Sequence, residues 1–300
     1  MGESFDDRVS RFIFGHRLPV SYREIIDNYC LPLAENLAGR VGLTPLLVGI
    51  NGAQGTGKST IADILALILH DLHGLRTAVI SIDDFYLSRA EREQLAASVH
   101  PLLKTRGVPG THNIQQAIEM IGQLKTVGKY KTLSMPTFDK AEDDVMPPEQ
   151  WREQPSAVDV ILLEGWCVGT PAQDDQALLE PVNALEACED ADSSWRRFVN
   201  ENLSGSYHEL NAMIDFLLLL EAPDFETVFE WRGKQEDKLR DRNPDAGYVM
   251  SGTELIRFIQ HYERLTRHNL KVLPELADAV LSFDHEHRVQ NYRYKDLPSP

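Results

Sequence analysis

The chain has 300 residues, of which 42% are hydrophobic, enough to bury the core of one large domain or of two smaller ones. Its formal net charge of -16 argues against nucleic acid or an anionic membrane surface as the main partner, and we find neither the apolar core of a signal peptide nor a stretch long enough to span a membrane. The cysteines, Cys30, Cys167 and Cys188, have no metal-binding or redox spacing, so we expect reduced, buried thiols in a cytoplasmic protein.

Residues 1–44 are predicted to form a helical extension that packs on the core. Five apolar side chains follow one another at helical spacing before Gly39: Ile25, Ile26, Tyr29, Leu33 and Leu37. Residues 45–290 are then expected to form the main domain, and residues 291–300 a C-terminal tail. We find no internal repeat and no low-complexity linker, which favours a single principal domain.

A phosphate-binding loop follows the first predicted strand, Leu46–Ile50. The pattern is Gly52-x-x-x-x-Gly57-Lys58-Ser59, followed by an apolar helical pattern that ends at Gly74. Glycines let backbone N–H groups surround phosphates, the lysine reaches the β and γ oxygens, and the hydroxyl can bind Mg²⁺. The residues expected to contact a nucleoside triphosphate are Gly52, Ala53, Gln54, Gly55, Thr56, Gly57, Lys58, Ser59 and Thr60.

Four further buried-strand patterns follow, and helical patterns separate them. They cover Thr77–Ile82, Val158–Leu163, Ile214–Leu220 and Ala279–Phe283. This alternation predicts a doubly wound α/β fold of the P-loop type, with a mainly parallel sheet and helices on both faces. Ligands of such folds bind at the carboxyl ends of the strands, so the residues that follow each strand are candidates for the chemistry.

Two carboxylates, Asp83 and Asp84, follow the second predicted strand. A carboxylate beside a bound triphosphate suits proton abstraction from a hydroxyl or metal binding, and we assign the role of general base to Asp83. The alternative is an Asp-Asp turn that caps a helix. The third strand pattern ends at Glu164, and its carboxylate, with Ser59 and Asp83, is the expected ligand set for Mg²⁺.

Two loops carry candidate groups for a second substrate. Arg106 in the segment 104–113 could bind an anion, and His112 or Asn113 could bind hydroxyl groups; the alternative is a surface turn with Asn113 as a helix cap. Asp139 and Lys140 follow a short predicted strand, Lys131–Ser134, and could point into the same pocket. Here the alternative is solvated surface, because the acidic run 142–144 comes directly afterwards.

A lid is predicted over residues 228–247, where a helical pattern becomes dense in arginine and lysine. On closure, Arg232 or Arg240 would reach the transferring phosphoryl group and neutralise its charge. The alternative is an exposed helix with alternating charges. The run Asp284-His285-Glu286-His287 contains metal-ligating residue types, but we interpret it as a polar strand end.

These residues together resemble the phosphoribulokinase, uridine kinase and pantothenate kinase group of P-loop kinases, in which an element like Asp83–Tyr86 supplies the base. Within that group the chain is most similar to D-glycerate 3-kinase and its uncharacterised ATP-dependent relatives. The similarity lies in SIDDFYLS, RGVPGTHN, PTFDKAEDD, LLEGWCVG, FEWRGKQEDKLR and HYERLTRH.

The resemblance implies ATP as donor, Mg²⁺ as cofactor, Asp83 as base, and an acceptor pocket formed by Arg106, His112 and the 138–140 loop, with Asp84 and Tyr86 as further substrate contacts. It departs from the family at Val145, where relatives often carry an arginine after the acidic pair. If that arginine binds the substrate carboxylate, glycerate specificity does not follow from the motif.

The expected reaction is ATP-dependent phosphorylation of a hydroxyl group on a small metabolite, with D-glycerate favoured and 3-phosphoglycerate as the product. The alternatives are the same reaction on a pantothenate-like acid or a nucleoside, and a regulatory P-loop ATPase without a small acceptor. A pocket rich in cations would favour an acid, whereas stacking aromatic rings without cations would favour a nucleoside. The sequence does not indicate the oligomeric state.

Overall fold

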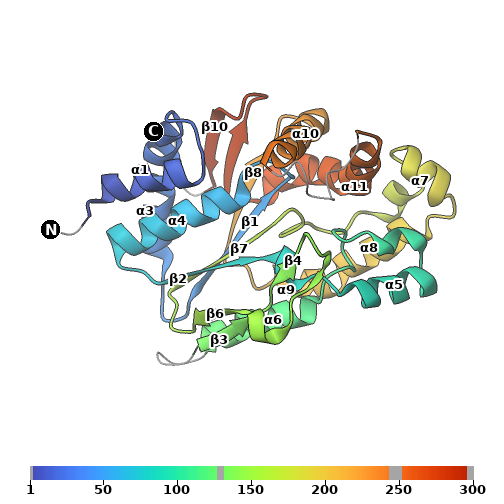
Figure 1. Cartoon of the computed structure of the whole chain (residues 1–300), viewed down its shortest axis with the longest axis horizontal. Helices are drawn as coiled ribbons and strands as arrows, with labels where there is room; N and C mark the ends of the chain where they lie inside the picture. Colours follow the sequence, from blue (N-terminus) through green and yellow to red (C-terminus); the bar gives the residue numbers. More distant parts are fainter. Residues whose placement is uncertain (1–2, 127–131, 243–251, 296–300) are drawn as a thin grey trace.

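A central six-stranded sheet organises the molecule (Figure 1). The computed structural model describes residues 3–126, 132–242 and 252–295, without the side chains of 235–242 and 253. The strand order is β10-β9-β8-β1-β7-β2, and every pair is parallel except β9 and β10. The strands are β1 (Leu46–Gly52), β2 (Thr77–Ser81), β7 (Val160–Gly165), β8 (Phe216–Glu221), β9 (Ala279–Phe283) and β10 (Val289–Tyr294). The mainly parallel α/β fold predicted from the sequence is confirmed.

Successive residues of the central strands face opposite helical layers, because side chains alternate along a strand. Leu47 packs with α6 (Ile114–Thr126), α8 (Ser194–Ser204) and α9 (Ser206–Asn211). Its neighbour Val48 packs with α3 (Leu31–Arg40) and α4 (Lys58–His73) on the other face. Both faces of the sheet are therefore covered, and the central strands β1 and β7 are buried along their length.

The N-terminal helices lie on the α4 side of the sheet (Figure 1). They are α1 (Phe5–Gly15), α2 (Tyr22–Ile25) and a short π-helical turn, η1 (Ile26–Cys30), which runs directly into α3. The predicted apolar stripe packs into this core, with Ile26, Leu33 and Leu37 buried.

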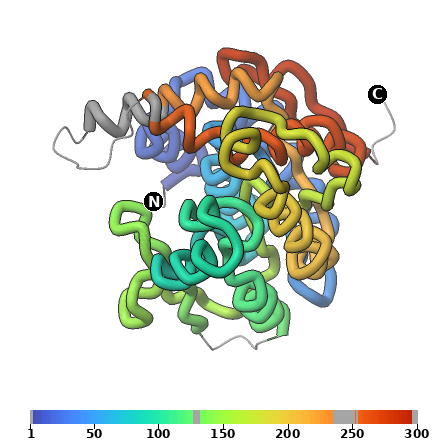
Figure 2. The backbone as a smooth tube through the Cα atoms, turned by 90° about the vertical axis from the view of Figure 1, so that its right-hand side faces the viewer, coloured from blue at the N-terminus to red at the C-terminus, as the bar shows by residue number. Residues whose placement is uncertain are grey.

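The segment between β2 and β7 gathers on one side of the molecule, drawn from teal to yellow-green in Figures 1 and 2. It contains two small antiparallel pairs, β3 (Thr132–Met135) with β6 (Arg152–Pro155), and β4 (Phe138–Asp139) with β5 (Asp144–Val145). It also contains the 3-10 turns η2 (Ile82–Phe85), η3 (Pro101–Lys104) and η4 (Pro148–Gln150), and the helix α5 (Arg89–Ser98). The strand expected at 131–134 starts at Thr132, since residue 131 lies outside the described residues.

The C-terminal half adds α7 (Ala184–Glu189), the 3-10 turn η5 (Asp175–Leu178) and two long helices, α10 (Phe225–Arg242) and α11 (Gly252–Leu276). Three expectations change. The second strand stops at Ser81, because η2 begins at Ile82. Strand β10 runs to Tyr294, so the expected boundary at residue 290 falls inside a strand. Cys30 and Cys167 are buried as expected, but Cys188 is exposed.

Among the described residues, no helix is both long enough and apolar enough to cross a membrane.

Candidate active site

The loop between β1 and α4 has the backbone geometry of a phosphate cradle. Gly55 and Gly57 have φ values of 86° and 90°, which L-residues rarely adopt. A Cβ on Gly52 would lie 2.5 Å from Oγ1 of Thr56, so the tight turn leaves no room for a side chain there. Thr56 donates its hydroxyl to the carbonyl of Ala53 at 2.8 Å and closes the loop on itself.

Lys58 begins α4 and folds back over the loop, where its Nζ donates to the carbonyl of Ala53 at 3.1 Å. Burial lowers the pKa of Lys58, and the carboxylates of Glu164 and Asp83 oppose that effect. Lys58 therefore interacts electrostatically with both acids, Glu164 at the end of β7 and Asp83 directly after β2. The contacts of the nine loop residues, including Gln54 and Thr60, with a nucleotide remain predictions.

Glu164 lies at the end of β7, between the ends of β1 and β2. It pairs with Ile50 on one side and with Ser81 on the other. Its side chain is buried, and Oε1 accepts a hydrogen bond from the Ser59 hydroxyl at 2.9 Å. A serine hydroxyl beside a buried carboxylate is a set of hard oxygen donors, which fits Mg²⁺.

Asp83 lies in η2, directly after β2, and is held by two side chains. Its Oδ1 accepts from the Tyr86 hydroxyl at 2.8 Å, and Nζ of Lys140 lies 2.6 Å from its Oδ2. Burial raises the pKa of Asp83, but Lys140, His112 and Tyr86 together bring it below its usual value. Asp83 is thus kept ionised, as a general base must be.

Asp84, the next residue, has the opposite character. Burial raises its pKa, and the positive charge of Arg152 opposes this only in part. The surroundings therefore lower the pKa of Asp83 and raise the pKa of Asp84, although the two residues are adjacent. The expected substrate contact of Asp84 remains a prediction.

Tyr86, His112 and Phe138 form a buried aromatic group beside Asp83. The rings of Tyr86 and His112 stack with centroids 4.4 Å apart, and Phe138 meets Tyr86 edge-on at 5.1 Å. The backbones also meet, because Tyr86 and His112 form an isolated antiparallel bridge. The alternative of a surface turn is therefore wrong for His112, although Asn113 does cap α6 by accepting from the Gln116 amide at 3.1 Å.

His112 presents one unpartnered ring nitrogen. Its Nδ1 lies 2.5 Å from the hydroxyl oxygen of Tyr207, which also accepts from the Gly110 amide. Burial lowers the pKa of His112 to about 4, so the ring is neutral near pH 7. We assign the Tyr207 hydroxyl proton to Nδ1, because the Tyr207 oxygen already accepts from Gly110. The proton of the neutral ring then lies on Nε2, which is buried and has no hydrogen-bond partner among the described residues. Tyr207 was not among the residues predicted from the sequence, and it lies 95 residues further along the chain than His112.

Arg106 is held close to the Asp83 group. Its guanidinium pairs with Asp143, donates to the carbonyl of Lys140 at 3.4 Å, and lies over the Phe138 ring at 5.3 Å. Asp139 is turned towards its own loop, where Oδ1 accepts from the amides of Ala141 and Glu142. Lys140 is largely exposed, and its ammonium group reaches Asp83. The structure therefore brings Arg106, His112 and Lys140 around Asp83, and gives Asp139 a local turn-capping contact.

The start of α10 packs against the phosphate loop. A Cβ on Gly55 would lie 2.9 Å from Cβ of Trp231, and His287 stacks on the Trp231 indole with centroids 3.7 Å apart. Nε2 of His287 lies 2.8 Å from the Gly55 carbonyl and donates to it. Trp231 and His287 are contacts to the loop that sequence analysis missed. The run 284–287 forms the β9–β10 turn, as expected of a polar strand end.

Of the predicted lid arginines, Arg232 lies in α10 one residue after Trp231. Its guanidinium lies over the ring of Phe258 in α11 at 5.7 Å. Arg240 lies in the part of α10 whose side chains are outside the described residues. The end of the predicted lid, residues 243–247, is also outside them. The assignment of these arginines to the phosphoryl group remains a prediction.

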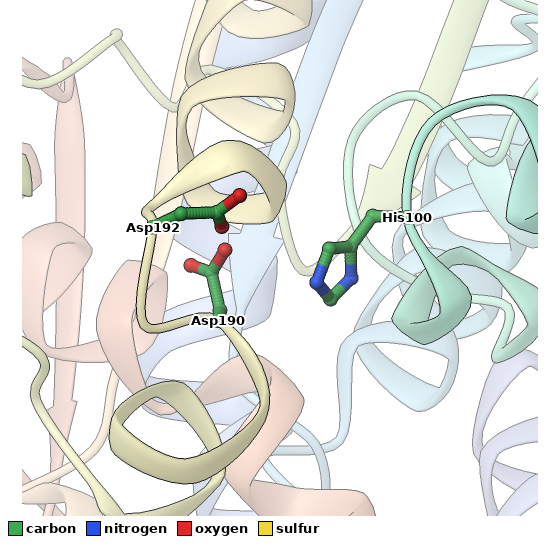
Figure 3. A group of neighbouring side chains, drawn as sticks. All are labelled: His100, Asp190 and Asp192. Carbon is green, nitrogen blue, oxygen red and sulfur yellow. The ribbon is translucent and has the colours of Figure 1, made fainter.

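One group of metal-ligating residue types lies elsewhere in the described residues, at His100, Asp190 and Asp192 (Figure 3). Its ligand atoms already have partners. Nδ1 of His100 accepts from the Leu102 amide, and Nε2 donates to the Glu189 carbonyl. Asp190 pairs with buried Arg196 at 2.7 Å, while Asp192 caps α8. We interpret this group as a structural joint between η3 and the α7–α8 turn.

No model of a known protein family matches the chain. The uncharacterized kinase mug58 of Schizosaccharomyces pombe is 32% identical over 259 residues, which cover 81% of this chain and 87% of that protein. Chloroplastic D-glycerate 3-kinase of Arabidopsis thaliana is 27% identical over 225 residues, covering 73% of this chain and 46% of that protein. The solved structure of D-glycerate 3-kinase from Cryptococcus neoformans superposes with a TM-score of 0.71 at 22% identity, covering 88% of this chain and 97% of that one, which supports the fold.

Proposed function

We propose that this protein uses ATP to phosphorylate a hydroxyl group of a small carboxylic acid. The chain belongs to the same family of P-loop kinases as mug58. The favoured acceptor is D-glycerate, and the product is then 3-phosphoglycerate. The observation that carries the proposal is the position of Asp83. An ionised carboxylate lies at a strand end beside the phosphate-loop lysine, and it is surrounded by cations and hydrogen-bond donors.

The residues divide the reaction between them. Asp83 accepts the proton of the acceptor hydroxyl while the hydroxyl oxygen forms a bond to the γ-phosphorus of ATP. The bond from that phosphorus to the β–γ bridging oxygen breaks, and ADP is released. Lys58 neutralises phosphate charge on the donor side. Ser59, Glu164 and Asp83 would hold Mg²⁺, which withdraws charge from the phosphate oxygens when bound.

The charges around Asp83 favour an acid as acceptor. Arg106 and Lys140 supply two cations on the acceptor side, and a carboxylate is the group that a guanidinium binds best. The aromatic rings beside them are buried: Tyr86 stacks on His112, and Phe138 meets Tyr86 edge-on. They therefore offer no open face to a nucleoside base. The unpartnered Nε2–H of His112 would donate to an oxygen of the acceptor.

D-glycerate and a pantothenate-like acid both satisfy this pattern. The family arginine missing at Val145 leaves the carboxylate to Arg106 or Lys140, and both of these side chains already have acidic partners that a substrate would have to replace. We favour D-glycerate because the chloroplastic D-glycerate 3-kinase of Arabidopsis thaliana is among the relatives of this chain.

A coupled ADP-release assay tests the proposal. Purified protein is assayed with ATP, Mg²⁺ and D-glycerate, L-glycerate, pantothenate or uridine, and ³¹P NMR identifies the phosphorylated position. D-lactate is the matched control, because it is D-glycerate without the 3-hydroxyl: it should compete with D-glycerate and release no ADP above the acceptor-free rate. If uridine is the best acceptor, the assignment of an acid is wrong. If none of the four raises ADP release, the proposed acceptor class is wrong.

A further inference from the structure

We propose that Arg92 is a positioning residue that sets the shape of the acceptor pocket. It lies in α5 and touches none of the candidate reacting groups, yet it ties together the three segments that present them. This inference rests on the proposed function, because it concerns the acceptor side of the same site.

Arg92 is 1% exposed and is one of the largest fully buried side chains among the described residues. Each of its three guanidinium nitrogens donates to a carbonyl of a different segment. Nε donates to Leu87 at 3.1 Å, Nη1 to Lys104 at 2.8 Å and Nη2 to Asp143 at 2.7 Å. Leu87 follows η2, Lys104 precedes Arg106, and Asp143 lies in the turn of the β4–β5 hairpin, which also carries Lys140.

Asp143 gives the same network a charged centre. Nη2 of Arg92 lies 3.0 Å from its carboxylate, and Arg106 pairs with the other carboxylate oxygen. The backbone of Asp143 has a φ of 55°, a left-handed conformation that is uncommon for a residue other than glycine and needs fixed surroundings. The Phe138 ring lies beneath both guanidinium groups, at 5.9 Å from Arg92 and 5.3 Å from Arg106.

The contacts run from Arg92 to the reacting carboxylate in two steps. Arg92 fixes the hairpin through Asp143, and the hairpin places Lys140, whose Nζ lies 2.6 Å from Asp83. Arg92 also fixes the backbone just before Arg106. A lysine at position 92 would keep the charge, but its single ammonium group cannot hold three carbonyls in fixed planar directions. The loops would then lose their common support while the buried charge stayed paired.

The test compares Arg92→Lys and Asp143→Asn with Arg196→Lys. Arg196 is a matched control, since it is also buried, donates to the Leu178 and Asp190 carbonyls and pairs with the Asp190 carboxylate, but it lies in α8 away from the site. With the acceptor that wild-type protein uses, Arg92→Lys and Asp143→Asn should raise the acceptor KM at least about tenfold and leave the ATP KM within about twofold. Arg196→Lys should leave both values unchanged.

Amide hydrogen exchange gives a readout that needs no acceptor. In Arg92→Lys, exchange should increase in peptides covering 104–112 and 138–145 and stay unchanged over the phosphate loop 52–59. A uniform increase across the chain, or a rise in both KM values together, would show that Arg92 only stabilises the fold. If wild-type protein has no acceptor-dependent activity, the proposed function fails, and the exchange pattern alone decides whether Arg92 supports these loops. Should Arg92→Lys not fold, Asp143→Asn carries the same comparison from the partially exposed end of the pair.

Discussion

The contact between α10 and the phosphate loop can be measured by comparing two glycine substitutions, Gly55→Ala and Gly57→Ala. Both glycines have positive φ, at 86° and 90°. Placing an L-residue in that conformation costs about 1–2 kcal/mol in either case. The two positions differ in their surroundings, so the difference between the variants isolates the packing of α10 on the loop.

A methyl group at position 55 would lie 2.9 Å from Cβ of Trp231, well inside the normal contact distance. At position 57, no heavy atom of the described residues lies within 4 Å, apart from the glycine's own chain neighbours. Overpacking of this kind adds about 1–3 kcal/mol. The expected loss of unfolding free energy is therefore about 2–5 kcal/mol for Gly55→Ala and about 1–2 kcal/mol for Gly57→Ala. Because 1 kcal/mol shifts Tm by roughly 2–4 °C in large domains, Gly55→Ala should melt several degrees below Gly57→Ala.

Thermal unfolding followed by circular dichroism, without nucleotide, checks this ranking. Gly122→Ala in α6 is the control: nothing lies within 4 Å of its Cβ position and its φ is not positive, so it should be neutral or stabilising by up to about 1 kcal/mol. Equal Tm values for the two loop variants would refute the reasoning, since they would mean that Trp231 does not pack on Gly55 in solution.

Three further predictions concern the reaction. Asp83→Asn should lower kcat by at least about a hundredfold, the scale of general-base loss, while calorimetry finds ATP affinity unchanged; an unchanged kcat would remove Asp83 from that role. The rate requires ionised Asp83, so kcat falls as the pH drops through the pKa of Asp83. Burial raises that pKa and Lys140 lowers it, so Lys140→Met should move the acid limb of the kcat profile to higher pH. An acid limb that stays in place would contradict the pairing of Lys140 with Asp83. His287→Phe keeps the stack on Trp231 but loses the hydrogen bond to Gly55, worth about 0.5–1.5 kcal/mol, so ATP should bind roughly two- to tenfold more weakly with the acceptor KM unaffected.

Features encoded by neighbouring residues could be predicted from the sequence. The phosphate loop follows from its own glycines, and the end of α4 follows from Gly74, which adopts φ 66°. The positions of the buried strands also follow, because a short apolar run between turn residues has few other uses. These patterns are local, and they determined the fold class.

Features that depend on distant pairing could not be predicted. The β2 pattern follows the β1 pattern in the sequence, but β7 lies between these two strands in the sheet. This strand order depends on the packing of the whole domain. Nothing near His112 in the sequence indicates Tyr207 as its partner, and nothing near Gly55 indicates His287. The turn-capping contact of Asp139 was not predicted either: its Oδ1 accepts from the amides of its own turn, and its expected substrate contact remains a prediction.

The position of the proposed acceptor-side residues in the chain has a consequence for how such enzymes diversify. Asp83, Arg106, His112 and Lys140 all belong to the single stretch between β2 and β7, whereas the phosphate loop, Trp231 and His287 lie outside it. The strands on either side are neighbours in the sheet and run parallel, so the stretch forms one crossover connection, from the carboxyl end of β2 to the amino end of β7. A relative's segment could therefore be exchanged for this one as a cassette, and selection could change the accepted metabolite without altering the machinery that handles ATP.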